Sequence, residues 1–227
     1  MISTGMFMSY FLIFAIIGIS ELLVRLFHLP KEESRKFVHI GVSHWWLIAM
    51  FFFTEWQWAI IPPITFIFLN LVSWYTGIFD SMERKTRDIN NLGTVYFPIA
   101  LLILVLLTWF DSPVFEGVHP YIGALGIMAM GYGDGFAGLI GTNFGKTKYT
   151  LFGATKSVEG SIAMLVASFI PLFVILLLGP GLGLVWALGG ALLLAVAATA
   201  IEALTPKGLD NLTVPLGTAL IWLFFFV

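Results

Sequence analysis

Long apolar segments alternate with short polar connections along nearly the whole chain. A membrane-spanning helix needs roughly 20 mainly apolar residues. This pattern predicts eight membrane-spanning helices, over Met6–Phe27, Phe37–Phe53, Trp56–Phe79, Gly93–Phe110, Val118–Phe144, Ser157–Leu178, Leu182–Leu204 and Leu212–Val227. The first segment has neither a preceding basic region nor an A-x-A cleavage site, so we expect a retained helix and not a signal peptide.

The amino-acid composition agrees with this pattern. Hydrophobic residues make up 59% of the chain and charged residues only 11%, whereas about 25% of a soluble domain is charged. A net charge of −2 gives no basic excess for nucleic-acid binding, and the absence of Cys excludes disulfides, thiolate metal sites and Cys nucleophiles. We therefore expect residues 1–227 to form a single all-α, polytopic domain in the cell membrane (plasma or inner membrane), with the lipid bilayer and no nucleic acid among its partners.

All 11 Lys and Arg residues fall on one side of the predicted helices. Arg25 lies in the last turns of the first helix, and the others lie in alternate connections: Lys31, Arg35 and Lys36, then Arg84, Lys85 and Arg87, then Lys146, Lys148 and Lys156, and finally Lys207. The intervening connections contain no Lys or Arg. Because basic residues collect on the cytoplasmic side of a membrane, we expect these connections in the cytoplasm and both the N- and C-termini outside.

Carboxylates inside or beside membrane helices are costly to bury and therefore mark candidate functional sites. Glu21 lies four residues before Arg25, so a helical ion pair explains it. The other candidates gather close to the basic connections: His39, Asp134, Glu159, Glu202 and Asp210. A transporter more often places such groups near the membrane midplane. Polar groups near one face favour an enzyme that acts on a charged cytoplasmic substrate, with a small-molecule transporter as the non-enzymatic alternative.

The glycine-rich run Gly131–Gly138 contains Asp134. Glycine lets the backbone approach a ligand closely, and it would open the helix so that its amides are free. An Asp in this setting can hold Mg²⁺, which prefers hard oxygen ligands shared with phosphates. We therefore predict Asp134 as a catalytic residue and metal ligand, with Glu202 as a second metal ligand and Gly133 and Gly135 as nucleotide-binding positions. Helix packing explains the glycines but not Asp134.

Lys156 and Ser157 open a predicted helix, where free N–H groups and the helix dipole favour an anion. Lys contributes a point charge and Ser a hydroxyl, so we predict that both bind the polyphosphate of a nucleotide, together with Lys146. Glu159 is a candidate catalytic residue, although a carboxylate in the first turn of a helix is also stabilised by the dipole. Lys148 is interpreted as a solvated loop charge.

Two further polar groups flank these runs. Arg35 and His39 share one face of the second helix, and Lys36 is adjacent to it. We predict His39 as a catalytic residue and Arg35 and Lys36 as residues that orient the lipid or its phosphate, with the ordinary basic flank of a cytoplasmic helix end as the alternative. Asp210 is a catalytic candidate and Asn211 a nucleotide-binding candidate, unless both only cap the last helix.

These motifs occur in an order that resembles the polyprenol kinase family: Arg35-Lys36-x-x-His39, Gly131-x-Gly133-Asp134-x-x-Ala137, Lys156-Ser157-x-Glu159-Gly160 and Asp210-Asn211-Leu212. This family includes dolichol kinase, phytol and farnesol kinases, and the fungal CTP-dependent diacylglycerol kinase. The short chain fits the phytol-kinase-like form. The resemblance implies an all-helical membrane fold in which the γ-phosphoryl group of CTP is transferred to a lipid alcohol, such as a prenol. It also implies a divalent cation such as Mg²⁺ and a site on the cytoplasmic face.

Four questions stay open at this point. The lipid alcohol could be diacylglycerol instead of a prenol. A phosphatidate cytidylyltransferase would also use CTP and Mg²⁺ in a membrane, although the Lys-Ser-x-Glu-Gly motif favours a kinase. The predicted nucleotide-binding residues address phosphates and do not select cytosine, so the choice of CTP rests on the resemblance. Glycine-rich faces can pack within one chain or between two chains, which leaves a homodimer open.

The predicted topology places Glu55 and Lys148 on opposite sides of the membrane. Because the chain has no native Cys, single cysteines at these positions can be labelled without background. With a membrane-impermeant maleimide on right-side-out membranes, we expect labelling of Glu55→Cys, and labelling of Lys148→Cys only after permeabilisation. Labelling of both variants from the same side would contradict the topology.

Overall fold

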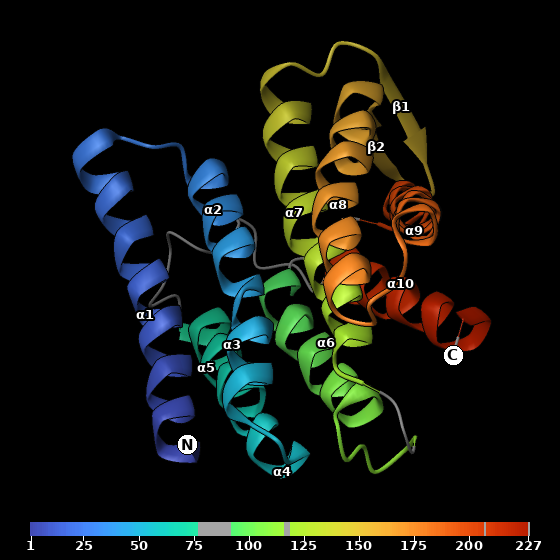
Figure 1. The fold of residues 1–227 in the computed structure, drawn as a ribbon. Coiled ribbons are helices and arrows are strands. Elements are labelled where there is room, and N and C mark those ends of the chain that lie inside the picture. The colour runs from blue at the N-terminus through green and yellow to red at the C-terminus, as the bar shows by residue number, and fades with distance from the viewer. Residues whose placement is uncertain (77–91, 116–118, 207, 227) are drawn as a thin grey trace.

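The described part of the chain is almost entirely helical. The computed structural model describes residues 1–76, 92–115, 119–206 and 208–226 (Figure 1). Its helices are α1 (Ile2–Phe27), α2 (Lys31–Ser43), α3 (Trp45–Phe52), α4 (Trp56–Ala59), α5 (Ile61–Thr76), α6 (Gly93–Thr108), α7 (Tyr121–Asn143), α8 (Val158–Leu178), α9 (Leu184–Leu204) and α10 (Asp210–Phe226). The predicted all-α class is confirmed.

One antiparallel hairpin lies between α7 and α8. Strand β1 (Lys148–Leu151) pairs with β2 (Ala154–Ser157), so that Lys148 lies opposite Ser157. Phe152 and Gly153 form the turn with φ angles of 47° and 81°, and two positive φ angles are what a two-residue hairpin turn of type I′ requires. The sequence predicts only a connection here, whereas the hairpin gives the basic residues of this stretch fixed places.

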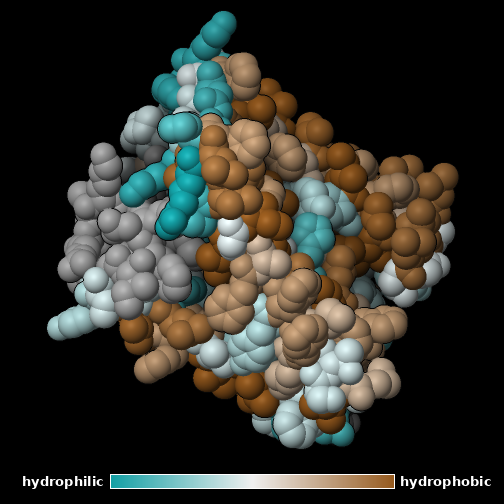
Figure 2. All heavy atoms as spheres, turned by 90° about the vertical axis from the view of Figure 1, so that its left-hand side faces the viewer, coloured by the Kyte–Doolittle hydropathy of each residue, from teal (hydrophilic) through white to brown (hydrophobic). Residues whose placement is uncertain are grey.

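Four helical segments are long and apolar enough to cross a membrane: α1, α4 with α5 (Trp56–Thr76), α8 and α9. Helices α6 and α10 are apolar but shorter. Figure 2 shows hydrophobic residues over much of the face around α1, with a group of hydrophilic residues at its upper end. Exposed aromatic side chains of α1, including Phe7 and Phe11, suit contact with lipid. These features indicate an integral membrane protein, while the count of eight spans stays a prediction.

The largest difference from the predicted boundaries is in the second segment. It was expected over Phe37–Phe53, but it is divided at His44 into α2 and α3, and α2 begins at Lys31. The first turn of α2 contains Glu32 and Glu33, whose negative charges favour a helix N-terminus, so the helix extends into a charged stretch. The following positions of the predicted spans and basic connections lie outside the described residues: 77–79, 118, 227, Arg84, Lys85, Arg87 and Lys207.

Several connections lie at two opposite ends of the molecule. In Figure 1 the N-terminus, α4 and the α6–α7 connection lie at one end, and the α1–α2 connection and the hairpin lie at the other. The α1–α2 connection leads into Lys31, and the hairpin carries Lys148 and Lys156. Helix α9 is seen nearly end-on in this view, while α1, α7 and α8 are seen from the side. The described helices therefore do not form a simple parallel bundle.

Helix α7 lies at the centre of the fold and packs against α2, α6, α8 and α10. Its glycine-rich run stays helical throughout, so the expectation that these glycines open the helix is wrong. The glycines permit close helix contacts instead, since a Cβ at Gly135 would collide with Ile40 of α2. A Cβ at Gly133 would come 2.5 Å from Met164 Sδ of α8. This packing within one chain holds Asp134 in the interior.

Candidate active site

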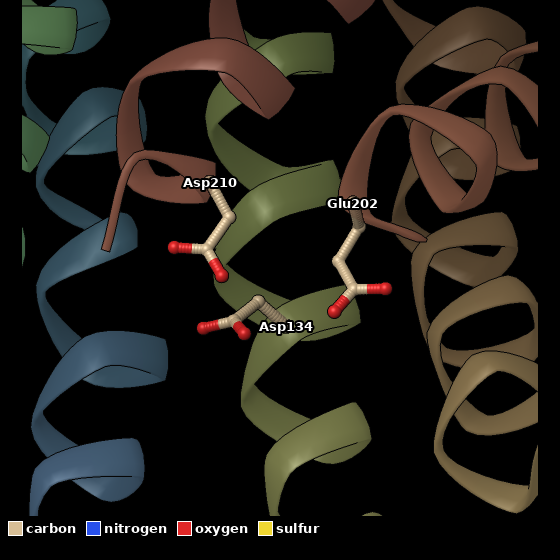
Figure 3. Close-up of side chains that lie close together, drawn as sticks. All are labelled: Asp134, Glu202 and Asp210. Carbon is tan, nitrogen blue, oxygen red and sulfur yellow. The ribbon is translucent and has the colours of Figure 1, made fainter. Parts of the chain in front are cut away.

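Three carboxylates from distant parts of the chain converge in the interior. Asp134 lies in α7, Glu202 near the end of α9 and Asp210 at the start of α10, and Figure 3 shows their side chains directed toward one another. Oxygen atoms of the three groups lie within 4.8 Å of one another, and all three residues are buried. Because mutual repulsion and lost hydration oppose such a cluster, it requires compensating positive charge.

Two lysine side chains provide that charge. Lys36 Nζ of α2 lies 2.5 Å from Asp134 Oδ2, and Lys156 Nζ of β2 lies 2.5 Å from Glu202 Oε1. Lys156 also donates a hydrogen bond to the backbone carbonyl of Glu202. His39 Nε2 lies 3.9 Å from Asp134 Oδ2. Three carboxylates thus face two ammonium groups. When all five groups are ionised, the cluster carries a net negative charge and can bind a further cation.

The carboxylate cluster has a donor set that fits a divalent metal ion. Mg²⁺ prefers carboxylate oxygens and commonly shares its coordination sphere with substrate phosphates. Asp134 and Glu202 are the metal ligands predicted from the sequence, and Asp210 lies within reach of the same ion. The predicted catalytic residue Asp210 is therefore also a candidate metal ligand.

Local hydrogen bonds fix the side chains at the start of α10. Asp210 Oδ1 accepts from the backbone N–H groups of Gly208, at 3.0 Å, and Asn211, at 3.1 Å. Gly208 has a φ of 98°, which residues with a Cβ rarely adopt, so this turn favours glycine. Asn211 Nδ2 donates to the carbonyl oxygen of Gly93 in α6 at 3.1 Å. The Asp210-Asn211 motif therefore anchors α10 to α6 and also places a carboxylate in the cluster.

A polar cavity lies beside the carboxylate cluster. Its walls come from α2, α7, the hairpin, the end of α9 and the first turns of α8 and α10. Besides the three carboxylates and their two lysines, the lining includes Arg35, Lys148, Ser157 and Asn211. Ser157 Oγ accepts from the Gly160 N–H at 3.1 Å and so caps α8. Cationic side chains next to a carboxylate cluster suit a polyphosphate that binds together with a metal ion.

A second cavity is mainly apolar. Side chains of α1, α3, α5 and α6 line it, including Ile13, Trp45, Phe66 and Leu101. Four residues line both cavities: Arg35, Lys36, Asp134 and Asn211. The polar and apolar cavities therefore meet beside Asp134.

Most of the predicted site residues line at least one of the two cavities: Arg35, Lys36, His39, Asp134, Lys156, Ser157, Glu202, Asp210 and Asn211. Four predicted residues line neither of them: Gly133, Gly135, Lys146 and Glu159. The Glu159 carboxylate accepts from the Thr147 N–H at 3.1 and 3.2 Å, which holds the start of the hairpin against α8. Lys146 is exposed. The catalytic role of Glu159 and the nucleotide-binding role of Lys146 stay predictions.

Lys148 and Asn70 are among the cavity residues that the sequence analysis does not predict. Lys148 was interpreted as a solvated loop charge, but its place at the start of β1 puts it on the wall of the polar cavity. The sequence does contain a pattern that is typical of a hairpin, namely two short runs with β-branched and aromatic residues on either side of a glycine. Asn70 lines the apolar cavity and donates to the Thr94 carbonyl at 2.7 Å. That carbonyl lacks its usual helical partner four residues on, because Pro98 has no N–H group.

Proteins with similar sequences cover most of this chain. It is 34% identical over 207 residues to the phytol kinase of Synechocystis sp., a match that covers 91% of this chain and 85% of that protein. This chain belongs to the polyprenol kinase family. A probable chloroplastic phytol kinase of Triticum aestivum is 33% identical over 218 residues, which cover 84% of this chain and 66% of the wheat protein. The dolichol kinase of Saccharomyces cerevisiae is 32% identical over 109 residues, or 48% of this chain and 19% of the yeast protein.

The resemblance to the polyprenol kinase family, inferred from four short motifs, is thus confirmed, as is the phytol-kinase-like form. No model of a protein family and no solved structure matches the chain. The helical and apolar character of the described residues agrees with a polyprenol kinase embedded in a membrane.

The buried ion pair between Lys156 and Glu202 should contribute strongly to stability. Replacing Lys156 by Met leaves a buried carboxylate without its partner, so we expect the free energy of unfolding to fall by about 3 kcal/mol. The double variant Lys156→Met/Glu202→Leu removes both charges and should recover most of this loss. Urea unfolding in detergent micelles measures both effects.

The pair between Glu21 and Arg25 is the matched control, with 2.7 Å between its charged atoms. This contact confirms the ion pair predicted for Glu21. The Arg25 side chain is 74% exposed, so Arg25→Met should change the free energy of unfolding by less than about 0.5 kcal/mol. Equal losses for Arg25→Met and Lys156→Met would show that burial does not strengthen the Lys156–Glu202 pair.

Proposed function

We propose that this protein phosphorylates the hydroxyl group of a prenol, such as phytol, farnesol or a polyprenol, with CTP as the phosphoryl donor. The observation that carries the proposal is the meeting of a polar and an apolar cavity beside Asp134. A nucleoside triphosphate suits the first cavity and an isoprenoid tail the second, so their reacting ends would lie together. Relatives named phytol kinase and dolichol kinase support this reaction, and the resemblance stated for the motifs supports CTP.

The polar cavity can neutralise a bound triphosphate. Phosphoryl transfer depends mainly on charge neutralisation and in-line positioning, because the protein contributes little covalent chemistry. Asp134, Glu202 and Asp210 would hold Mg²⁺, which supplies positive charge between the carboxylates and the phosphates. Lys36 and Lys156 would then no longer be needed to neutralise the carboxylates, and their ammonium groups could pair with phosphate oxygens.

The acceptor hydroxyl would reach the γ-phosphate from the apolar cavity. A bond forms between the alcohol oxygen and the γ-phosphorus while the bond from that phosphorus to the bridging oxygen breaks, and CDP leaves with the electron pair. The hydroxyl proton passes to a carboxylate, for which Asp134 and Asp210 are candidates on the cavity wall. His39 packs against Phe97 on the apolar side, with ring centres 4.8 Å apart, where it can contact the hydroxyl end of the lipid.

The site would open to the cytoplasm in a protein with eight spans and both termini outside. The hairpin with Lys148 and Lys156 lies at the opposite end of the molecule from the N-terminus (Figure 1). This distribution supports an external N-terminus, because basic residues collect on the cytoplasmic side. The polar cavity, which the hairpin helps to line, would then face the compartment that supplies the nucleotide.

Labelled nucleotide separates this reaction from its alternatives. Purified protein with γ-labelled CTP, tested with phytol, farnesol, undecaprenol, diacylglycerol and phosphatidate, should form a labelled monophosphate of a prenol and unlabelled CDP. A diacylglycerol kinase would form labelled phosphatidate instead. A phosphatidate cytidylyltransferase would release labelled pyrophosphate and form a CDP-lipid. Equal or faster transfer from ATP would contradict the proposed donor and leave the kinase reaction intact.

A further inference from the structure

The Asn211 side chain lies at the junction of the two cavities, because it lines both of them. Asn211 is only 7% exposed, and its amide nitrogen Nδ2 donates to the carbonyl oxygen of Gly93. The amide oxygen Oδ1 is buried and has no hydrogen-bond partner among the described residues. A buried acceptor without a partner has lost its hydrogen bonds to water, so a ligand that donates a hydrogen bond would be favoured there.

The surroundings of Asn211 fix the orientation of its amide. A backbone carbonyl only accepts hydrogen bonds, so the nitrogen must face Gly93 and the oxygen must point elsewhere. Gly93 permits this close contact, since a Cβ there would lie 2.6 Å from Asn211 Nδ2. The backbone N–H of Asn211 also donates to Asp210 Oδ1 at 3.1 Å, which holds the residue at the start of α10.

The unpaired oxygen of Asn211 distinguishes between the two substrates. Ionised phosphate oxygens are hydrogen-bond acceptors and have no proton to offer to Asn211 Oδ1. The donor groups of a nucleotide are on its ribose and base, beyond the phosphates that would face Asp134. The hydroxyl of a lipid alcohol has one donor hydrogen and two acceptor lone pairs. The sequence predicts a nucleotide-binding role for Asn211. Its Oδ1, however, can accept the hydrogen bond that the hydroxyl of a lipid alcohol donates.

We propose that Asn211 Oδ1 accepts a hydrogen bond from the hydroxyl group of the lipid alcohol and holds it at the junction of the two cavities. This inference rests on the proposed function. With its hydrogen directed to Asn211, the alcohol oxygen keeps its lone pairs available to the phosphoryl donor in the polar cavity. An amide is not a base at neutral pH, so Asn211 only orients the bound alcohol. The hydroxyl hydrogen must turn from Asn211 Oδ1 to a carboxylate as the new bond to phosphorus forms. An ether with the same tail has no donor hydrogen and is not held in this way.

Comparing the affinities for farnesol and farnesyl methyl ether separates the contribution of this hydrogen bond from that of burying the isoprenoid tail. The ether keeps the oxygen and the isoprenoid chain but lacks the hydroxyl hydrogen. Binding to the purified protein can be followed by tryptophan fluorescence, because Trp45 lines the apolar cavity. We expect the wild-type protein to bind farnesol about tenfold more tightly than the ether. In Asn211→Leu the two affinities should lie within about twofold of each other.

Two further variants keep the test decisive if Asn211→Leu does not fold. Gly93→Ala retains Asn211 but displaces its amide, so it should also reduce the preference for farnesol. Asn70 provides the matched control, because it makes an equivalent hydrogen bond to Thr94 in α6 but lines only the apolar cavity. Asn70→Leu should change both affinities by the same factor and preserve the preference.

The inference would be overturned if Asn211→Leu and Gly93→Ala both kept the preference for farnesol. It would also be overturned if only Asn70→Leu lost that preference. Weaker CTP binding by Asn211→Leu with an unchanged preference would also overturn it and assign Asn211 to the nucleotide. Wild-type protein without the preference overturns it as well, even if that protein phosphorylates prenols. Wild-type protein that has the preference but phosphorylates no prenol contradicts the proposed function alone.

Discussion

The pairing of three buried carboxylates with two lysines is the constraint on which this arrangement of helices depends. A carboxylate in an apolar interior is stable only when opposite charge and hydrogen bonds compensate for its lost hydration. Lys36 joins α2 to Asp134 of α7, and Lys156 joins the hairpin to Glu202 of α9. The two ion pairs therefore connect N-terminal and C-terminal elements around α7. Close packing supports the first pair, since a Cβ at Gly138 would collide with the Lys36 side chain.

The carboxylate cluster also lies at a boundary between two chemical environments. On one side are the hairpin and the first turn of α8, which carry polar and cationic groups. On the other side are apolar side chains of α1, α3, α5 and α6. A reaction between a charged donor and a lipid acceptor needs such a boundary, because burying charge in an apolar site and exposing an apolar tail to water are both unfavourable. Asp134 lines both the polar and the apolar cavity, and this position makes it the centre of the proposed reaction.

Sequence patterns predict well the features that depend on local chemistry. Apolar segments indicate the helices, and acidic or basic residues beside them indicate Asp134 and Lys156. The convergence of distant residues is not encoded in such patterns: Glu159 and Asp210 are both acidic residues at a helix start, yet the structure brings only Asp210 into the cluster. Glu159 instead accepts hydrogen bonds from the Thr147 backbone. Four-residue strands are too short for a clear periodicity, which is why the hairpin was missed.

The activity of Asp134→Asn over a range of Mg²⁺ concentrations tests most directly whether phosphoryl transfer occurs where the two cavities meet. The substitution keeps the size of the side chain and removes one carboxylate charge from the cluster. We expect a folded protein whose kcat falls about a hundredfold, a loss of about 3 kcal/mol of transition-state stabilisation, at every Mg²⁺ concentration. Wild-type activity in a folded Asp134→Asn protein would contradict this account, because the metal and the reacting phosphate would then bind elsewhere.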